Sequence, residues 1–287
     1  GARGLDDLGF AVGERHQRHL HGVDLVGRHD AGAVTVGVNE FAARLPSALA
    51  ALASILLTYE LCRRLFDATT GLLAVVILAS TVLFCAIGHF ANPDALLSFF
   101  TILNLFFLWL GWSREGRLWF GACGAAAGFA VLAKGPVGLV LPFAVCFVFL
   151  AWNRQLRLLV DRRLMRGCLT FLAVALPWYV WVGVETKAEF LRGFFLTHNV
   201  DRFRSPMEGH AGSSLYYVLV LLVGMAPWSI FLGLAAWYGT GKATWRDTQD
   251  DQRTSMPPAY RFLWSWIAVY FVFFSLAGTK LPNYIAP

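Results

Sequence analysis

The residues most able to do chemistry gather in a polar stretch between two apolar segments. This stretch contains His198, Asn199 and Arg202, and Tyr216 and Tyr217 follow where the next apolar segment begins. These side chains are donors of the kind that hold a phosphate, and a guanidinium can bind two phosphate oxygens at once. The stretch therefore predicts a site for an anionic phosphate at a membrane surface. Its spacing also fits an ordinary amphipathic loop whose basic side chains extend to water.

Three shorter motifs place a charge at the edge of an apolar segment. Lys280 stands beside Pro282, which breaks a helix and exposes backbone groups, so that a point charge there can meet a phosphate. Lys134 lies in a very short turn, where a charge is costly unless it is paired or reaches water. For both lysines the alternative is a side chain that extends to the membrane surface. Asp94 precedes an apolar run, a position that favours capping of a helix N-terminus over catalysis.

The composition shows what kind of elements must position these residues. The chain is 57% hydrophobic and only 15% charged, with 24 Phe and 11 Trp, which is typical of chains that span a bilayer. The five cysteines lie in or beside apolar stretches without Cys-x-x-Cys spacing, so they indicate small hydrophobic side chains rather than disulfides or a metal site. No phosphate-loop or His-Glu-x-x-His motif occurs. The net charge of +6 is better explained by membrane topology than by nucleic-acid binding.

Eight apolar segments approach the roughly 20 residues that a helix needs to cross a bilayer. The fourth is short and contains Gly121, Gly124 and Gly128, a spacing that lets another helix approach closely and predicts a buried position. The predicted fold class is all-α, a polytopic transmembrane helix bundle. We expect the spans at residues 43–62, 71–88, 95–112, 119–133, 136–152, 168–184, 215–239 and 260–277.

The basic residues divide unequally between the loops that eight spans would place on alternate sides. One set of loops contains thirteen Lys and Arg, and because basic residues concentrate in the cytoplasm, this set is predicted to be cytoplasmic. The other set contains only six and includes the motifs described above. The thirteen are Arg63, Arg64, Arg114, Arg117, Arg154, Arg157, Arg162, Arg163, Arg166, Lys242, Arg246, Arg253 and Arg261, and the six are Lys134, Lys187, Arg192, Arg202, Arg204 and Lys280.

Residues 1–38 differ from the remainder of the chain. They are rich in Gly, His, Arg and Asp and contain no apolar run long enough to span a membrane. The segment is typical of mistranslated or disordered sequence, and the character changes abruptly after Gly37. We therefore expect a transmembrane domain over residues 39–287 that is truncated at both ends.

Five motifs occur in an order that resembles a known family. They are Asn39-Glu40-Phe41-Ala42-Ala43-Arg44-Leu45-Pro46-Ser47, Asn92-Pro93-Asp94-Ala95-Leu96, Lys134-Gly135-Pro136-Val137-Gly138, the stretch from His198-Asn199 to Arg202-Phe203 with Glu208-Gly209-His210, and Lys280-Leu281-Pro282-Asn283-Tyr284. The series resembles the bacterial aminoarabinose transferase and protein-mannosyltransferase-like family. That family belongs to the C-type superfamily of integral-membrane glycosyltransferases, which use polyprenyl-phosphate sugars.

The resemblance implies transfer of a sugar from an undecaprenyl-phosphate carrier to a lipid such as lipid A, a glycan or a protein, at the periplasmic face of the bacterial inner membrane. Cations would stabilise the departing phosphate, and an acidic residue would act as base. Arg202 and Tyr284 match the family's phosphate contacts. The resemblance implies no certain cofactor; a divalent metal is left open without assigned ligands, and nucleic acid is not an expected partner. Lys280, Lys134 and His198 are neighbouring candidates, and Asp94 and Asn199 are candidate supporting residues.

The sequence also departs from this family. Members begin with a span, an outer loop with an acidic pair, a Lys-Pro motif and a second span, none of which is present here. Asp6 and Asp7 form an acidic pair without the surrounding pattern, so the catalytic base is not assigned. We expect the 287-residue chain alone to lack transferase activity. The alternatives are a multi-pass transporter or lipid flippase, which often shows an internal repeat not found here, and a structural subunit without catalysis.

Overall fold

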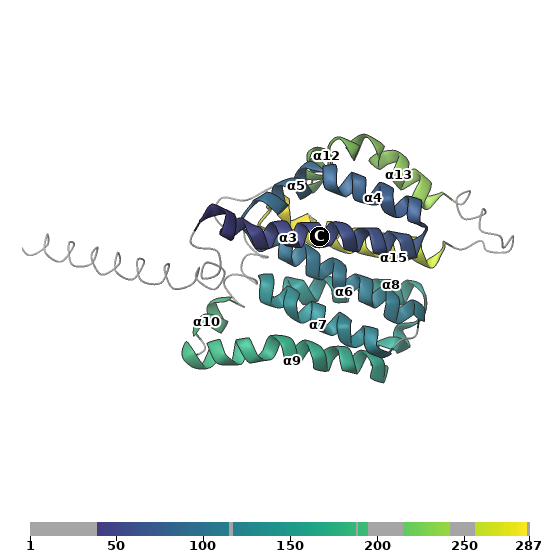
Figure 1. Ribbon diagram of the computed structural model, residues 1–287. Coiled ribbons are helices and arrows are strands. Elements are labelled where there is room, and N and C mark those ends of the chain that lie inside the picture. Colours follow the sequence, from purple (N-terminus) through teal and green to yellow (C-terminus); the bar gives the residue numbers. More distant parts are fainter. Residues whose placement is uncertain (1–38, 115–116, 188, 195–214, 242–255, 286–287) are drawn as a thin grey trace, which may run out of the picture. The chain divides into compact units, whose positions relative to one another are not determined.

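The structure, a computed structural model, describes residues 39–114, 117–187, 189–194, 215–241 and 256–285, and every regular element in them is a helix (Figure 1). The chain divides into two compact units, Gly1–Pro46 and Ser47–Pro287. The predicted all-α class is confirmed. The α-helices are α3 (Glu40–Leu65), α4 (Ala68–Ser80), α5 (Val82–His89), α6 (Asp94–Arg114), α7 (Arg117–Lys134), α8 (Val137–Trp152), α9 (Arg162–Glu185), α10 (Glu189–Arg192), α12 (Tyr216–Gly224), α13 (Leu232–Thr240) and α15 (Pro258–Leu276), and the 3-10 helices are η1 (Leu156–Val160), η3 (Trp228–Phe231) and η4 (Pro282–Ile285).

All eight predicted apolar segments are helical, but they are not equally long. Helices α3, α6, α9 and α15 are long and apolar enough to cross a membrane. Helices α4 and α5 are bent by 64° at their junction, and α12 is bent by 117° against the η3–α13 segment, so that counting each pair as one span gives six. Helices α7 and α8 are shorter. The transmembrane bundle is thus present, and the count of eight spans stays a prediction.

The two bent pairs meet at their breaks. The Val82 N–H donates to the Ala226 carbonyl oxygen at 3.4 Å, and the Trp228 Nε1–H donates to Ser80 Oγ at 2.8 Å. In hydrocarbon no water can satisfy the backbone groups that a break releases, so protein groups must do it. Each break therefore supplies hydrogen-bond partners for the other.

The core joins α6, α8 and α15, which pack against one another mainly through α8 (Figure 1). Phe149 of α8 and Phe262 of α15 are fully buried, and their rings meet edge to face with centroids 5.3 Å apart. Trp109 of α6 lies 5.4 Å from the same Phe262 ring. Offset and edge-on aromatic contacts of this kind add to the stabilisation from burial.

Helix α7 packs against α6, α8 and α9, as its glycine spacing predicted. A Cβ atom built on Gly124 would stand 1.9 Å from the Gly167 carbonyl oxygen of α9, so only glycine permits this approach. Contacts between α7 and α9 run in the same order along both helices, from Gly121 with Thr170 to Gly128 with Val174. The two helices are therefore parallel and begin at the same end of the bundle.

The directions of the helices place the two sets of loops at opposite ends of the bundle. One end, here called the polar end, contains Asn92–Asp94, Lys134–Pro136, Lys280–Tyr284 and the start of α12. The other, here called the arginine end, contains residues 153–166 together with Arg64 and Arg261. There the Arg261 Nη1 donates to Asn153 Oδ1 at 3.0 Å. The described loops separate as the charge count predicted, whereas the loops with Arg202 and Arg204 and with Lys242, Arg246 and Arg253 lie outside the described residues. The side of the membrane that each end faces stays a prediction.

Candidate functional site

Asp94 lies at the centre of the polar end. It is the first residue of α6 and is only 4% exposed. Its carboxylate forms an ion pair with the Lys134 ammonium at the end of α7 and accepts a hydrogen bond from the Asn283 amide of η4. A buried carboxylate requires such partners because burial removes its hydration. The contact joins three motifs that are far apart in the sequence.

The prediction that Asp94 mainly caps its helix needs correction. Asn92 supplies the capping oxygen, since its Oδ1 accepts the Asp94 N–H at 3.2 Å. Ser47 of α3 in turn donates its hydroxyl to the Asn92 carbonyl oxygen at 3.0 Å. The Asp94 carboxylate still lies at the positive end of the α6 dipole, but it pairs with the Lys134 and Asn283 side chains.

Lys134 is placed where it can hold a second anion. Gly135, with a φ of 87°, makes the tight turn that follows it, a conformation that favours glycine. The Lys134 ammonium lies 4.9 Å from the centre of the Tyr284 ring, and the Lys134 side chain is 24% exposed. An ammonium group has three N–H donors, so the bond to Asp94 leaves donors that a phosphate can use.

Lys280 has a different surrounding. Its ammonium donates to the carbonyl oxygens of Ser275 at 2.8 Å, Ala277 at 3.1 Å and Phe274 at 3.4 Å, all at the end of α15. It is 6% exposed and lies 5.5 Å from the centre of the Tyr217 ring. The last carbonyls of a helix lack partners within the helix and carry its negative dipole end, which a cation stabilises. Lys280 thus closes α15, and its phosphate contact stays a prediction.

Two further residues belong to the cluster: Tyr217, which the sequence analysis grouped with the phosphate donors, and Asn283, to which it assigned no role. Tyr217 is fully buried and donates its hydroxyl to the Leu281 carbonyl oxygen at 3.2 Å, which ties α12 to the segment after α15. Asn283 binds Asp94. Asn283 directly precedes Tyr284 in the sequence, and an amide beside a candidate phosphate ligand is the signal that could have identified it.

The described part of the polar end brings together Lys134, Lys280, Tyr284 and Asp94 but not every predicted residue. Arg202, together with His198 and Asn199, lies outside the described residues. In the described part, no group of three or more His, Cys, Asp or Glu side chains converges on a point where a metal could bind. The described residues therefore assign no ligands to a divalent metal.

A bundle of helices apolar enough to cross a membrane, with paired charges at one end, defines an integral-membrane protein. Residues 31–181, more than half of the chain, match the family described as dolichyl-phosphate-mannose-protein mannosyltransferase. The chain belongs to this family. The resemblance seen in the five sequence motifs is thereby confirmed.

Relatives and a solved structure extend this result. The chain is 32% identical over 262 residues to the undecaprenyl phosphate-alpha-4-amino-4-deoxy-L-arabinose arabinosyl transferase of Pseudomonas aeruginosa (strain UCBPP-PA14), covering 89% of this chain and 45% of that protein. The corresponding protein of Pseudomonas paraeruginosa is 31% identical over 261 residues, with the same coverage. The crystal structure of ArnT from Cupriavidus metallidurans bound to undecaprenyl phosphate superposes with a TM-score of 0.75 at 30% identity, covering 89% of this chain and 45% of that one.

These comparisons confirm the predicted fold, that of the C-type glycosyltransferases. The chain spans about half the length of the curated relatives it matches. The fold and the family are therefore established, while the activity of the whole protein is a matter for proposal.

Proposed function

We propose that the protein acts in the transfer of a sugar from an undecaprenyl-phosphate carrier to a lipid, glycan or protein acceptor, with the carrier phosphate held at the polar end. The observation that carries this proposal is the convergence of Lys134 and Asn283 on Asp94, with the Lys134 ammonium over the Tyr284 ring. The names of the relatives support the donor class, and so does the relative whose crystal structure contains undecaprenyl phosphate.

The geometry suggests a role for each group. As the glycosidic bond breaks, the leaving phosphate gains charge, and a cation that is already in place stabilises it. Lys134 supplies this cation, and Asp94 and Asn283 fix its position. Because both oxygens of Asp94 are engaged by these neighbours, we assign it a positioning role and not that of the base that activates the acceptor hydroxyl.

The loop that precedes α12 is proposed to complete the site with Arg202, His198 and Asn199. We also propose that the polar end faces the periplasm, because the arginine end carries the excess of basic residues expected of a cytoplasmic face. This orientation places the carrier phosphate in the outer half of the inner membrane.

Binding of undecaprenyl phosphate to the chain in lipid nanodiscs tests the location of the site. We expect Lys134→Met and Tyr284→Phe each to weaken binding roughly tenfold, which corresponds to the loss of one hydrogen bond to a charged group. Tyr260→Phe removes a hydroxyl from the first turn of α15, at the arginine end, and is the matched control. Unchanged affinity in both polar-end variants would exclude this location.

Transfer itself requires a second assay with labelled undecaprenyl-phosphate aminoarabinose and membranes that contain acceptor lipids. The two bent helix pairs are a feature that transporters also show, so movement of the lipid across the membrane is measured in parallel. Label transferred to an acceptor supports the proposal and overturns the expectation that the 287-residue chain alone is inactive. Lipid movement without any transfer would instead establish a flippase.

A further inference from the structure

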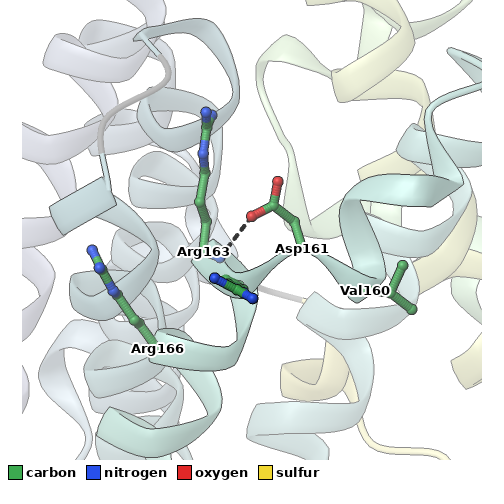
Figure 2. Close-up of a pocket in the computed structure, with 5 residues that line it drawn as sticks. Val160, Asp161, Arg163 and Arg166 are labelled. Atoms are coloured by element: carbon green, nitrogen blue, oxygen red, sulfur yellow. Dashed lines mark hydrogen bonds between the residues drawn. The ribbon is translucent and has the colours of Figure 1, made fainter.

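The arginine end contains a second charged site, which the proposed function does not use. An open pocket of about 540 Å³ lies where η1 passes into α9 and is lined by Val160, Asp161, Arg162, Arg163 and Arg166 (Figure 2). Figure 2 shows the Arg163 and Arg166 side chains extending from the start of α9, with Asp161 beside Arg163. Because α7 and α9 are parallel, this pocket and Lys134 lie at opposite ends of that helix pair.

The charges around this pocket are not balanced. Asp161 is the only acidic residue of the lining, and its carboxylate is already used because it accepts the Arg163 N–H at 2.8 Å. Within the part of the chain that the structure describes, no ion pair or hydrogen bond engages the guanidinium groups of Arg162 and Arg166. Three guanidinium groups against one carboxylate make the pocket a place where an anion is stabilised.

The surroundings of the pocket distinguish a lipid from a soluble anion. Val160 is 86% exposed, Met165 is 56% exposed and Leu169 is 62% exposed, all beside the arginines. Only 11% of the apolar span of α9 is buried inside the structure, so this helix presents a wide apolar face. Basic groups at the end of such a face are the arrangement that recognises anionic lipid headgroups.

We propose that this pocket binds the phosphate of an anionic phospholipid, with the acyl chains lying along the exposed face of α9. Arg162 and Arg166 each offer a planar pair of N–H donors that matches two phosphate oxygens. The adjacent apolar side chains contact the first methylene groups of the lipid. The bound lipid would neutralise the excess charge at the start of α9 and fix this end of the helix at the membrane surface.

Native mass spectrometry of the full chain, released from micelles that contain phosphatidylglycerol and phosphatidylcholine in equal amounts, tests the proposal. The Arg162→Gln/Arg166→Gln double variant removes two charges from the pocket. The Arg154→Gln/Arg157→Gln double variant removes two charges from the same loop outside the pocket lining. We expect the first to retain phosphatidylglycerol at least roughly tenfold less well, since hydrogen bonds to a charged group are lost, and the second to behave like the parent chain.

The two double variants and a competing anion separate a specific lipid site from diffuse attraction. An equal loss in the two double variants would show diffuse attraction by the loop and overturn the site, as would no loss in either. Inorganic phosphate is added as a competitor, and displacement of the lipid at similar concentrations would identify a soluble anion as the occupant and overturn the lipid assignment. Arg162→Lys/Arg166→Lys keeps the charge without the planar fork, and its intermediate retention is the further expected result.

Discussion

The two ends of the helix bundle use charge in opposite ways. At the polar end one ion pair lies inside the bundle, between the buried Asp94 and the partly buried Lys134. At the arginine end the charges are many and exposed, as in the pair that Arg63 forms with Glu60, where the side chains are 45% and 28% exposed. Burying a pair costs desolvation that only good geometry offsets, whereas an exposed pair is nearly neutral in stability.

This difference indicates what each end requires. A buried pair holds its groups in one arrangement, which a site for bond breaking needs because its cation must already be in place. Exposed arginines need only be present in sufficient number to orient the chain in the membrane. The pocket at the start of α9 is the one place at the arginine end where we propose that geometry matters as well.

The largest expected effect on stability comes from the contact between α7 and α9, the two helices that run from the arginine end to the polar end. Gly124→Val would place a side chain 1.9 Å from the Gly167 carbonyl oxygen and force α7 away from α9. We expect a loss of at least about 4 kcal/mol in the free energy of unfolding, measured by denaturant titration in mixed micelles. Gly121→Ala is the control, because its Cβ would meet Thr170 at an ordinary 3.7 Å. Equal stability of the two variants would show that this contact is not tight.

The second prediction compares a buried pair with an exposed one. Asp94→Ala leaves the Lys134 ammonium without its carboxylate partner, and we expect a loss of about 3 kcal/mol. Glu60→Gln removes the carboxylate that pairs with Arg63 and Arg64, and we expect a loss of less than about 1 kcal/mol. The same unfolding titration measures both. Similar losses would mean that burial does not distinguish the two ends.

The third prediction concerns the cation that closes α15. Lys280→Met removes the donor to three carbonyl oxygens, and we expect a loss of about 2 kcal/mol in the free energy of unfolding. Hydrogen exchange of the last turn of α15 should rise in parallel. If Lys280 instead serves only the carrier phosphate, the variant would keep its stability and lose affinity for undecaprenyl phosphate.

Much of the fold could be predicted because a membrane imposes a simple pattern on the sequence. A span needs a long apolar run, and basic residues mark one side, so the eight segments and the separation of the loops follow from composition. The breaks at Thr81 and at Ala226 could not be predicted. They depend on hydrogen bonds between segments far apart in the chain, such as that from Trp228 to Ser80.

Several of the predicted site residues lie together at the polar end, but their contacts were not predicted. Lys134 was identified because a charge in a short turn between apolar segments is costly. Lys280 was identified as a charge at a membrane boundary, and Tyr284 through the family resemblance. Which group pairs with which depends on tertiary packing. Asp94 was interpreted as a cap because the sequence does not reveal that Lys134 lies within reach of it, and Lys280 was not expected to turn back onto its own helix.

The smallest expected effect is a pH dependence at the start of α4. Asp67 caps this helix, and the hydrogen bonds from the Thr70 N–H and hydroxyl, at 2.9 and 2.8 Å, lower the pKa of its carboxyl below the ordinary value. Because the folded pKa is the lower one, the contribution of Asp67 to stability is complete above the ordinary aspartate pKa of about 3.9 and is lost as the pH falls through the folded value.

Asp67→Asn keeps a capping oxygen that does not titrate. We therefore expect its thermal midpoint in a nonionic detergent to fall slightly less than that of the parent chain between neutral and acidic pH. Parallel falls would show that the hydrogen bonds of this exposed carboxylate add nothing to stability.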